Sequence, residues 1–303
     1  AVISVFCFCL ASANASDMNS ITFPNGLSEI EARYDAILCD VWGVIHNGRE
    51  AFHDACDALA AFRKKGKPVI LITNAPVRAA QVEELFPGFG VRRDCFDKTA
   101  SSGDATRLLL DEYAPGPAYR FGTDSSEERD NTLFEGCELT FSGPEEAKFI
   151  VAMGLRDQFN DKPEDYRDEL KTLVKRDLEM ICANPDIQVR VGDTLVWCAG
   201  ALARIYEELG GKVVYPGKPH DAIYELAYRH LERVAGSLPD KRRILAIGDG
   251  PATDMKGANQ QGLDCLYVGT GLNQSQSNFE DNTAALMQRN GVTASYAMSG
   301  LRW

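Results

Sequence analysis

Four separate apolar runs of the chain end in polar side chains that could do chemistry. The runs are AILCD, VILITN, KVVYPGK and ILAIGD, and the last continues into GPATD. Their ends supply three carboxylates, one amine, one hydroxyl and one amide, from Asp40, Thr73, Asn74, Lys218, Asp249 and Asp254. Neighbouring carboxylates repel one another unless a cation lies between them, so this set predicts a cation bound where the runs end.

The residue types suit one cation and one substrate group. Mg²⁺ prefers oxygen ligands, keeps several waters, and binds through a few carboxylates plus substrate phosphate. A lysine adds a positive charge and a hydroxyl adds a hydrogen bond, which both suit a phosphoryl group. An aspartate can also act as a nucleophile and form an aspartyl phosphate. The set therefore predicts Mg²⁺-assisted transfer of a phosphoryl group to water, driven mainly by positioning and electrostatics.

Each of these residues taken alone has a simpler explanation. A lone aspartate after a strand is a helix cap or turn residue more often than a nucleophile. Thr73 and Asn74 alone could be turn residues, and Lys218 alone would be a solvated lysine. The prediction therefore depends on all four ends being polar in one chain.

Strands and helices alternate around these residues. YDAILCDVWGV and PVILITNAP are typical of buried parallel strands, and DACDALAAFRKKGK has apolar residues at helical spacing with Gly66 as its stop. The rhythm returns late in the chain, from ALARIYEELGG through RRILAIGDG to DCLYVGTG. The pattern predicts an α/β fold, a Rossmann-like doubly wound parallel sheet with its ligand at the carboxyl ends of the strands.

The predicted organisation is one core interrupted by an insertion. The 303 residues suggest about two domains. We expect residues 18–98 and 206–303 to form the Rossmann-like hydrolase core, and residues 99–205 to form an inserted α/β cap domain. Residues 1–17 are apolar and end in an A-x-A-like stretch, but lack the positively charged start of a signal peptide. We expect them to be a non-native extension, with a genuine export signal as the rival hypothesis.

The composition excludes several classes of partner. The chain is 45% hydrophobic and 25% charged, as a globular protein is, and its formal net charge is −12. Nucleic-acid binding needs a basic face, and an anionic-membrane anchor needs a basic amphipathic helix, so we expect neither partner. Nine cysteines include no CxxC pair, which argues against zinc and favours buried thiols in a reducing cytoplasm.

Taken together, the motifs resemble those of the haloacid dehalogenase superfamily. ILCDVWGV, ILITNAP, YPGKP and ILAIGDGPATD stand in the superfamily's order, over roughly residues 30–275. The long gap between the second and third motifs resembles the group with a large C2-type α/β cap. The GKP motif and the ANPD stretch resemble subfamily IIA, the sugar-phosphate and nitrophenyl-phosphate phosphatases. The resemblance implies hydrolysis of a small phosphorylated metabolite, with a sugar phosphate as one candidate.

The resemblance also implies a metal site. Asp40 would be both the nucleophile and a Mg²⁺ ligand. The main-chain carbonyl of Trp42 would be a second ligand and Asp249 a third, while Asp254 would support the metal or its waters.

The resemblance assigns the remaining polar residues to the substrate. Thr73 and Asn74 would hold the phosphoryl oxygens, and Lys218 would neutralise charge on the nucleophile and the phosphate. Asn184 and Asp186, in the cap, are candidates for contact with the rest of the substrate. Caps of this type often dimerise, so a homodimer formed through the cap is a further expectation.

One position departs from the superfamily pattern. Its phosphatases usually carry a second aspartate two residues after the nucleophile, as general acid, and Trp42 stands there. Indole cannot donate and recover a proton at pH 7, and losing a general acid typically costs about 10²–10⁴-fold in rate.

Three hypotheses follow from Trp42. The protein is a weak phosphatase or one for good leaving groups, a non-catalytic or regulatory phosphate-ligand-binding protein, or a dehalogenase. Retention of Asp249 and Asp254 argues against the dehalogenase. His46, six residues after Asp40, could supply a proton, although a lone loop histidine is more often a surface residue.

Overall fold

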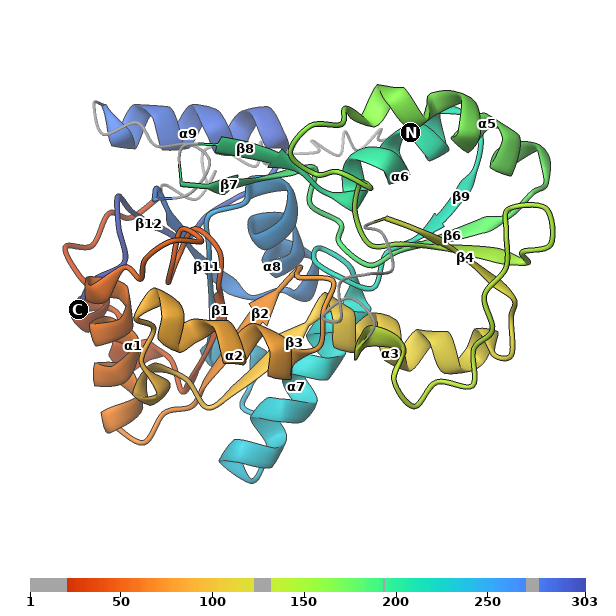
Figure 1. The fold of residues 1–303 in the computed structure, drawn as a ribbon. Helices are drawn as coiled ribbons and strands as arrows, with labels where there is room; N and C mark the ends of the chain where they lie inside the picture. The colour runs from red at the N-terminus through yellow and green to blue at the C-terminus, as the bar shows by residue number, and fades with distance from the viewer. Residues whose placement is uncertain (1–20, 123–131, 193, 271–277) are drawn as a thin grey trace, which may run out of the picture.

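The computed structural model describes residues 21–122, 132–192, 194–270 and 278–303, and within them the chain forms two parallel sheets (Figure 1). The expectation for residues 1–17 lies outside these described residues. We use the word core for the six-stranded sheet and its helices, and cap for the four-stranded sheet, its helices and a hairpin beside it.

The core sheet has the strand order β12-β11-β10-β1-β2-β3, and every neighbouring pair is parallel. Its strands are β1 (Ala36–Asp40), β2 (Val69–Thr73), β3 (Lys98–Ser101), β10 (Ile244–Gly248), β11 (Asp264–Val268) and β12 (Tyr296–Met298). Every residue of β1, β2 and β10 is buried, because helices cover both faces of the sheet. This confirms the predicted doubly wound parallel sheet.

Two layers of helices enclose the core sheet. Alternate residues of β1 show the division, because Ile37 packs with one layer and Leu38 with the other. One layer consists of α1 (His53–Lys64) and α2 (Ala79–Phe89). The other consists of α7 (Asp221–Ala235), α8 (Lys256–Gln261) and α9 (Phe279–Asn290). The end of the described chain forms helix α9 and the edge strand β12.

The cap has a smaller parallel sheet with the order β4-β5-β6-β9. Its strands are β4 (Ala118–Phe121), β5 (Phe149–Ala152), β6 (Glu179–Cys182) and β9 (Lys212–Val214). Helices α5 (Arg167–Lys175) and α6 (Ala199–Glu208) pack on one face of this sheet. Helix α3 (Ser102–Tyr113) connects β3 of the core to β4 of the cap. An antiparallel hairpin, β7 (Gln188–Val191) and β8 (Thr194–Trp197), forms a separate two-stranded sheet.

The strand pairing places both boundaries between the core and the cap differently from the expected ones, at residues 98 and 206. β3 reaches residue 101 within the core sheet, although we expect the core segment to end at 98. β9, expected in the core, pairs with β6 of the cap, so Lys218 does not follow a strand of the core sheet. Both strands are short, KTAS in β3 and KVV in β9, and neither sequence indicates to which sheet the strand belongs; only the partner strand decides it.

In the described part of the chain, none of the helices combines the length and the apolar character that crossing a bilayer requires.

Candidate active site

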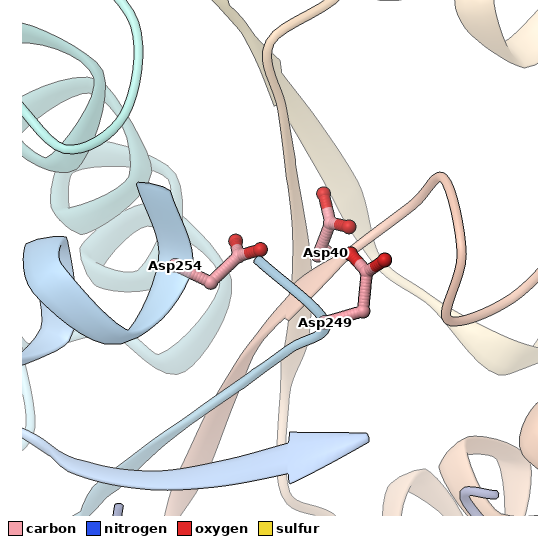
Figure 2. A group of neighbouring side chains, drawn as sticks. All are labelled: Asp40, Asp249 and Asp254. Carbon is pink, nitrogen blue, oxygen red and sulfur yellow. The ribbon is translucent and has the colours of Figure 1, made fainter. Parts of the chain in front are cut away.

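The predicted polar residues come together at the carboxyl end of the core sheet. Asp40 and Thr73 are the last residues of β1 and β2, and Asp249 follows β10. Asp254 lies in a π-helical turn, Pro251–Met255, directly before α8. Because β10, β1 and β2 are adjacent and parallel, their ends meet at one edge. Figure 2 shows the three aspartates side by side, and one oxygen of each lies within 4.8 Å of the others.

Lys218 joins two of these carboxylates. Its Nζ lies 2.5 Å from Asp40 Oδ1 and 2.7 Å from Asp254 Oδ1, and the residue is only 2% exposed. Burial alone would lower the pKa of this ammonium, but Asp254 and Asp40 outweigh it and hold the pKa above its ordinary range. Lys218 therefore remains a cation throughout the physiological pH range.

One ammonium does not balance three carboxylates. Burial, followed by repulsion from Asp254, raises the pKa of Asp40 to about 7 despite the bond to Lys218. Burial, followed by Asp40 and Asp254, also raises the pKa of Asp249. The cluster is therefore short of positive charge at neutral pH. This all-oxygen, electron-rich donor set fits a divalent cation such as Mg²⁺.

Local backbone features hold the aspartates in place. The amide of Gly250 donates to Asp254 Oδ2 at 3.0 Å, so both oxygens of Asp254 have protein partners. That arrangement suits a supporting position better than a direct metal contact. Gly43 has a positive φ of 86°, and a Cβ there would overlap the Asp249 carboxylate, so glycine is required beside the cluster.

Asn74 connects the core to the cap. Its Nδ2 donates to Asp186 Oδ1 at 2.9 Å, and its Oδ1 accepts from the amide of Lys218 at 2.8 Å. Asp186 and Asn74 thus both lie at the site, as predicted. Asn184 does not line the cavity, and its contact with substrate stays a prediction. Its Oδ1 accepts from the amide of Asp186 at 3.1 Å, which holds the turn that delivers Asp186.

A cavity of about 510 Å³ opens above the cluster, between the core and the cap. Trp42 lines it together with Thr73, and Trp42 Nε1 donates to the main-chain oxygen of Arg190 in β7 at 2.7 Å. The residue that replaces the usual general acid thus holds the hairpin of the cap against the core. Because its N–H already has an acceptor, this side chain offers no proton to a leaving group.

His46 is a core residue, so the expectation of a surface histidine is wrong. It is 2% exposed, its ring packs against Trp42, Phe86 and Phe89, and it does not line the cavity. Burial lowers its pKa to about 4, so the ring is neutral at pH 7. Its Nδ1 accepts from the amide of Gly48 at 3.0 Å. It is therefore not a proton source for the cavity.

Sequence reasoning missed the part of the cavity wall that is contributed by two loops, the π-helical turn and the hairpin. The residues concerned are Asn47, Arg49, Glu50, Gln188, Val189, Arg190, Thr253 and Thr270. Thr253 lies in the GPATD stretch and Thr270 follows the apolar run DCLYV, but the other six belong to no apolar run that ends in a polar residue. The polar stretch HNGRE, shortly after Asp40, was the only signal for Arg49 and its neighbours.

Comparisons with known proteins agree with this geometry. Residues 37–132 match the family model of haloacid dehalogenase-like hydrolases, and residues 215–288 match a second model of HAD-hydrolase-like proteins. The structure of a haloacid dehalogenase-like hydrolase from Brucella suis 1330 is 41% identical, with a TM-score of 0.83. That match covers 92% of this chain and 100% of the Brucella chain.

Two curated proteins are more distant relatives. The 5'-nucleotidase YutF of Bacillus subtilis is 26% identical and is matched over 82% of this chain and 92% of its own length. The ribonucleotide monophosphatase NagD of Escherichia coli K12 is also 26% identical, over 78% of this chain and 88% of its own length. The two model matches and the Brucella relative include both halves of the core and the aspartate-bearing strand ends. The chain therefore belongs to the haloacid dehalogenase superfamily of hydrolases, in its subfamily IIA.

Proposed function

We propose that this protein is a Mg²⁺-dependent phosphatase that hydrolyses the phosphomonoester of a small metabolite through an aspartyl phosphate on Asp40. One observation carries the proposal: a buried carboxylate, held by Lys218 beside two further aspartates, lies at the base of a cavity of metabolite size. The names of YutF and NagD, a nucleotidase and a nucleotide monophosphatase, support phosphomonoester chemistry.

The proposed metal site uses Asp40, Asp249 and the main-chain carbonyl of Trp42, with Asp254 in support. When bound there, Mg²⁺ would neutralise charge on the carboxylates and on the phosphoryl oxygens. The Thr73 hydroxyl and the Asn74 amide would orient the phosphoryl group, and the Lys218 ammonium would stabilise its developing charge.

The proposed reaction has two displacements. A carboxylate oxygen of Asp40 bonds to phosphorus as the bond to the ester oxygen breaks, and the departing oxygen takes a proton from solvent. Water then attacks the phosphorus, the bond to Asp40 breaks, and phosphate leaves while the proton of the water passes to solvent. Because Trp42 supplies no proton, the first displacement favours esters with good leaving groups.

A non-catalytic or regulatory phosphate-ligand-binding protein is the second candidate. The observation that favours it is the indole of Trp42, which stands at the acid position and is bonded to Arg190. Dehalogenation has less support, because the three-carboxylate cluster suits a metal rather than a halide-releasing site.

The expectations about the substrate, the partners, the oligomeric state and the cellular compartment stay predictions. The substrate would be a small phosphorylated metabolite, with a sugar phosphate as one candidate, and neither nucleic acid nor membrane would be a partner. A homodimer through the cap is predicted as well. A reducing cytoplasm is the proposed compartment, and it is supported by the free cysteines of the described chain, most of them buried.

Turnover of p-nitrophenyl phosphate tests the proposal, since its leaving group needs little help from an acid. We expect hydrolysis with Mg²⁺, loss of hydrolysis in EDTA and recovery when excess Mg²⁺ is returned. We also expect Mg²⁺ to raise the melting temperature, because a cation relieves repulsion within the buried cluster. Absence of turnover of this ester and of a sugar-phosphate panel, with retained binding of phosphate ligands, would favour the second candidate.

Trp42→Asp tests whether the missing acid limits the rate. We expect turnover of an alkyl ester such as glycerol 3-phosphate to rise about 10-fold or more, with a smaller change for p-nitrophenyl phosphate. Trp42→Phe is the control, because it loses the same bond to Arg190 without supplying an acid. Equal rates in the two variants on the alkyl ester would show that protonation is not limiting.

A further inference from the structure

Besides Lys218, two further basic residues line the cavity, and neither is among the residues proposed to hold the phosphoryl group. Arg49 comes from the core loop after β1, and Arg190 comes from β7 of the cap hairpin. Both line the same cavity as Asp40 and Lys218. Neither arginine belongs to any of the motifs that predict the reaction.

These two guanidinium groups have no acidic partner within the described residues. No ion pair joins either of them to a carboxylate there, although Glu50 also lines the cavity. The Nε of Arg190 is buried and lacks a hydrogen-bond acceptor. A buried donor without an acceptor is costly unless a ligand or water satisfies it, so this side chain is positioned for an acceptor that enters the cavity.

The hairpin that carries Arg190 is fixed to the core by its backbone. Trp42 Nε1 donates to the carbonyl of Arg190 at 2.7 Å, and the amide of Gly192 donates to the carbonyl of Asn47 at 3.2 Å. A Cβ at Gly192 would overlap the guanidinium of Arg49, so this glycine leaves room for it. In Figure 1 the β7–β8 hairpin accordingly extends from the cap over the end of the core sheet.

From these contacts we propose that Arg49 and Arg190 bind a second anionic group on the substrate, so that the natural substrate is a phosphomonoester whose alcohol part carries a carboxylate or another phosphate. Guanidinium groups present paired N–H donors that match the oxygens of either anion. The inference deepens the proposed function and depends on it for the identity of the reacting phosphoryl group. It makes the two arginines specificity-determining residues.

Matched substrate pairs test the proposal and separate the two anions. 3-Phosphoglycerate and glycerol 3-phosphate differ by a carboxylate, and fructose 1,6-bisphosphate and fructose 6-phosphate differ by a phosphate. We expect the native protein to prefer the more anionic member of at least one pair by about 10- to 100-fold in kcat/KM. The pair with the larger preference identifies the anion.

Substitution of the arginines should remove this preference. In the double variant Arg49→Gln, Arg190→Gln we expect the two members of the pair to differ by less than about 3-fold. Arg190→Lys should keep part of the preference, since it retains the charge but not the fork of donors. The bond from Trp42 is made to a main-chain carbonyl, so these substitutions keep the hairpin's anchor, and thermal melting verifies the fold. Arg229→Gln, an exposed arginine of α7 away from the cavity, is the charge control and should leave the preference intact.

Two results would overturn the inference: native protein with no preference in either pair, or a preference that survives in the double variant. Failure of the proposed function looks different, because p-nitrophenyl phosphate would then not be hydrolysed at all. In that case the same pairs are compared by calorimetric binding, where the anion preference and its loss in the double variant are still expected.

Discussion

Asp40→Asn should lower the Mg²⁺-dependent turnover of p-nitrophenyl phosphate on the order of 10⁴-fold or more. The amide has the shape of the carboxylate but neither its negative charge nor its nucleophilic oxygen, so no aspartyl phosphate forms. Steady-state hydrolysis of the ester measures the loss. Quenched incubation with labelled substrate should detect a phosphorylated protein with native Asp40 and none with the variant.

The variant should fold as well as the native protein, which separates loss of chemistry from loss of structure. Burial raises the pKa of Asp40 from 3.8 to about 7, so ionised Asp40 costs stability at every pH above its unfolded value. The neutral amide removes that cost, so in EDTA at pH 8 the variant should melt at or above the temperature of the native protein. Turnover within about 10-fold of native would exclude Asp40 as the nucleophile.

Lys218→Met should destabilise the metal-free protein by about 3–5 kcal/mol, because it leaves Asp40 and Asp254 buried without their cation. Denaturant unfolding in EDTA at pH 8 measures the difference. Lys64→Met is the matched control, since Lys64 is exposed at the end of α1 and should change stability little. A loss no larger than that of the control would contradict the assignment of Lys218 as the counter-charge of the cluster.

The same variant should show a distinct pH dependence. Burial raises the pKa of Asp40 to about 7 in the native protein although Lys218 lowers it, so removing Lys218 should raise this pKa further, and the variant should gain stability by protonation from a higher pH than the native protein does. The deficit of Lys218→Met should therefore shrink between pH 8 and pH 5, where the unpaired carboxylate takes up a proton. Excess Mg²⁺ at pH 8 should restore part of the stability as well, because it supplies the missing positive charge.

Three features of the site were predictable because they are local in the sequence. A buried parallel strand must be apolar throughout, so AILCD, VILIT and ILAIG identify β1, β2 and β10 without any partner being known. The polar residue after each strand is then at the carboxyl end of the sheet by geometry alone. Asp40, Thr73 and Asp249 must therefore all lie at the carboxyl end of the core sheet.

Lys218 and Asp186 were predicted as site residues, but the way they reach the site was not. β9, which precedes Lys218, belongs to the sheet of the cap, and the chain crosses back to the core immediately before α7. Asp186 acts through a hydrogen bond to Asn74, a residue 112 positions earlier in the chain. Contacts of this kind depend on which strand a short apolar segment pairs with, and the segment itself does not encode its partner.

The sequence by itself thus determined which polar residues stand at the carboxyl end of the core sheet, because a run of apolar residues and the polar residue that ends it are adjacent in the chain. Only the tertiary structure decided what surrounds those residues. His46 is buried because Trp42, Phe86 and Phe89 close around it, and Arg190 reaches the cavity because the indole of Trp42 binds its carbonyl. The ring contacts of His46 join two separate segments of the core, and the bond from Trp42 joins the core to the cap, so each exists only once those segments have packed together.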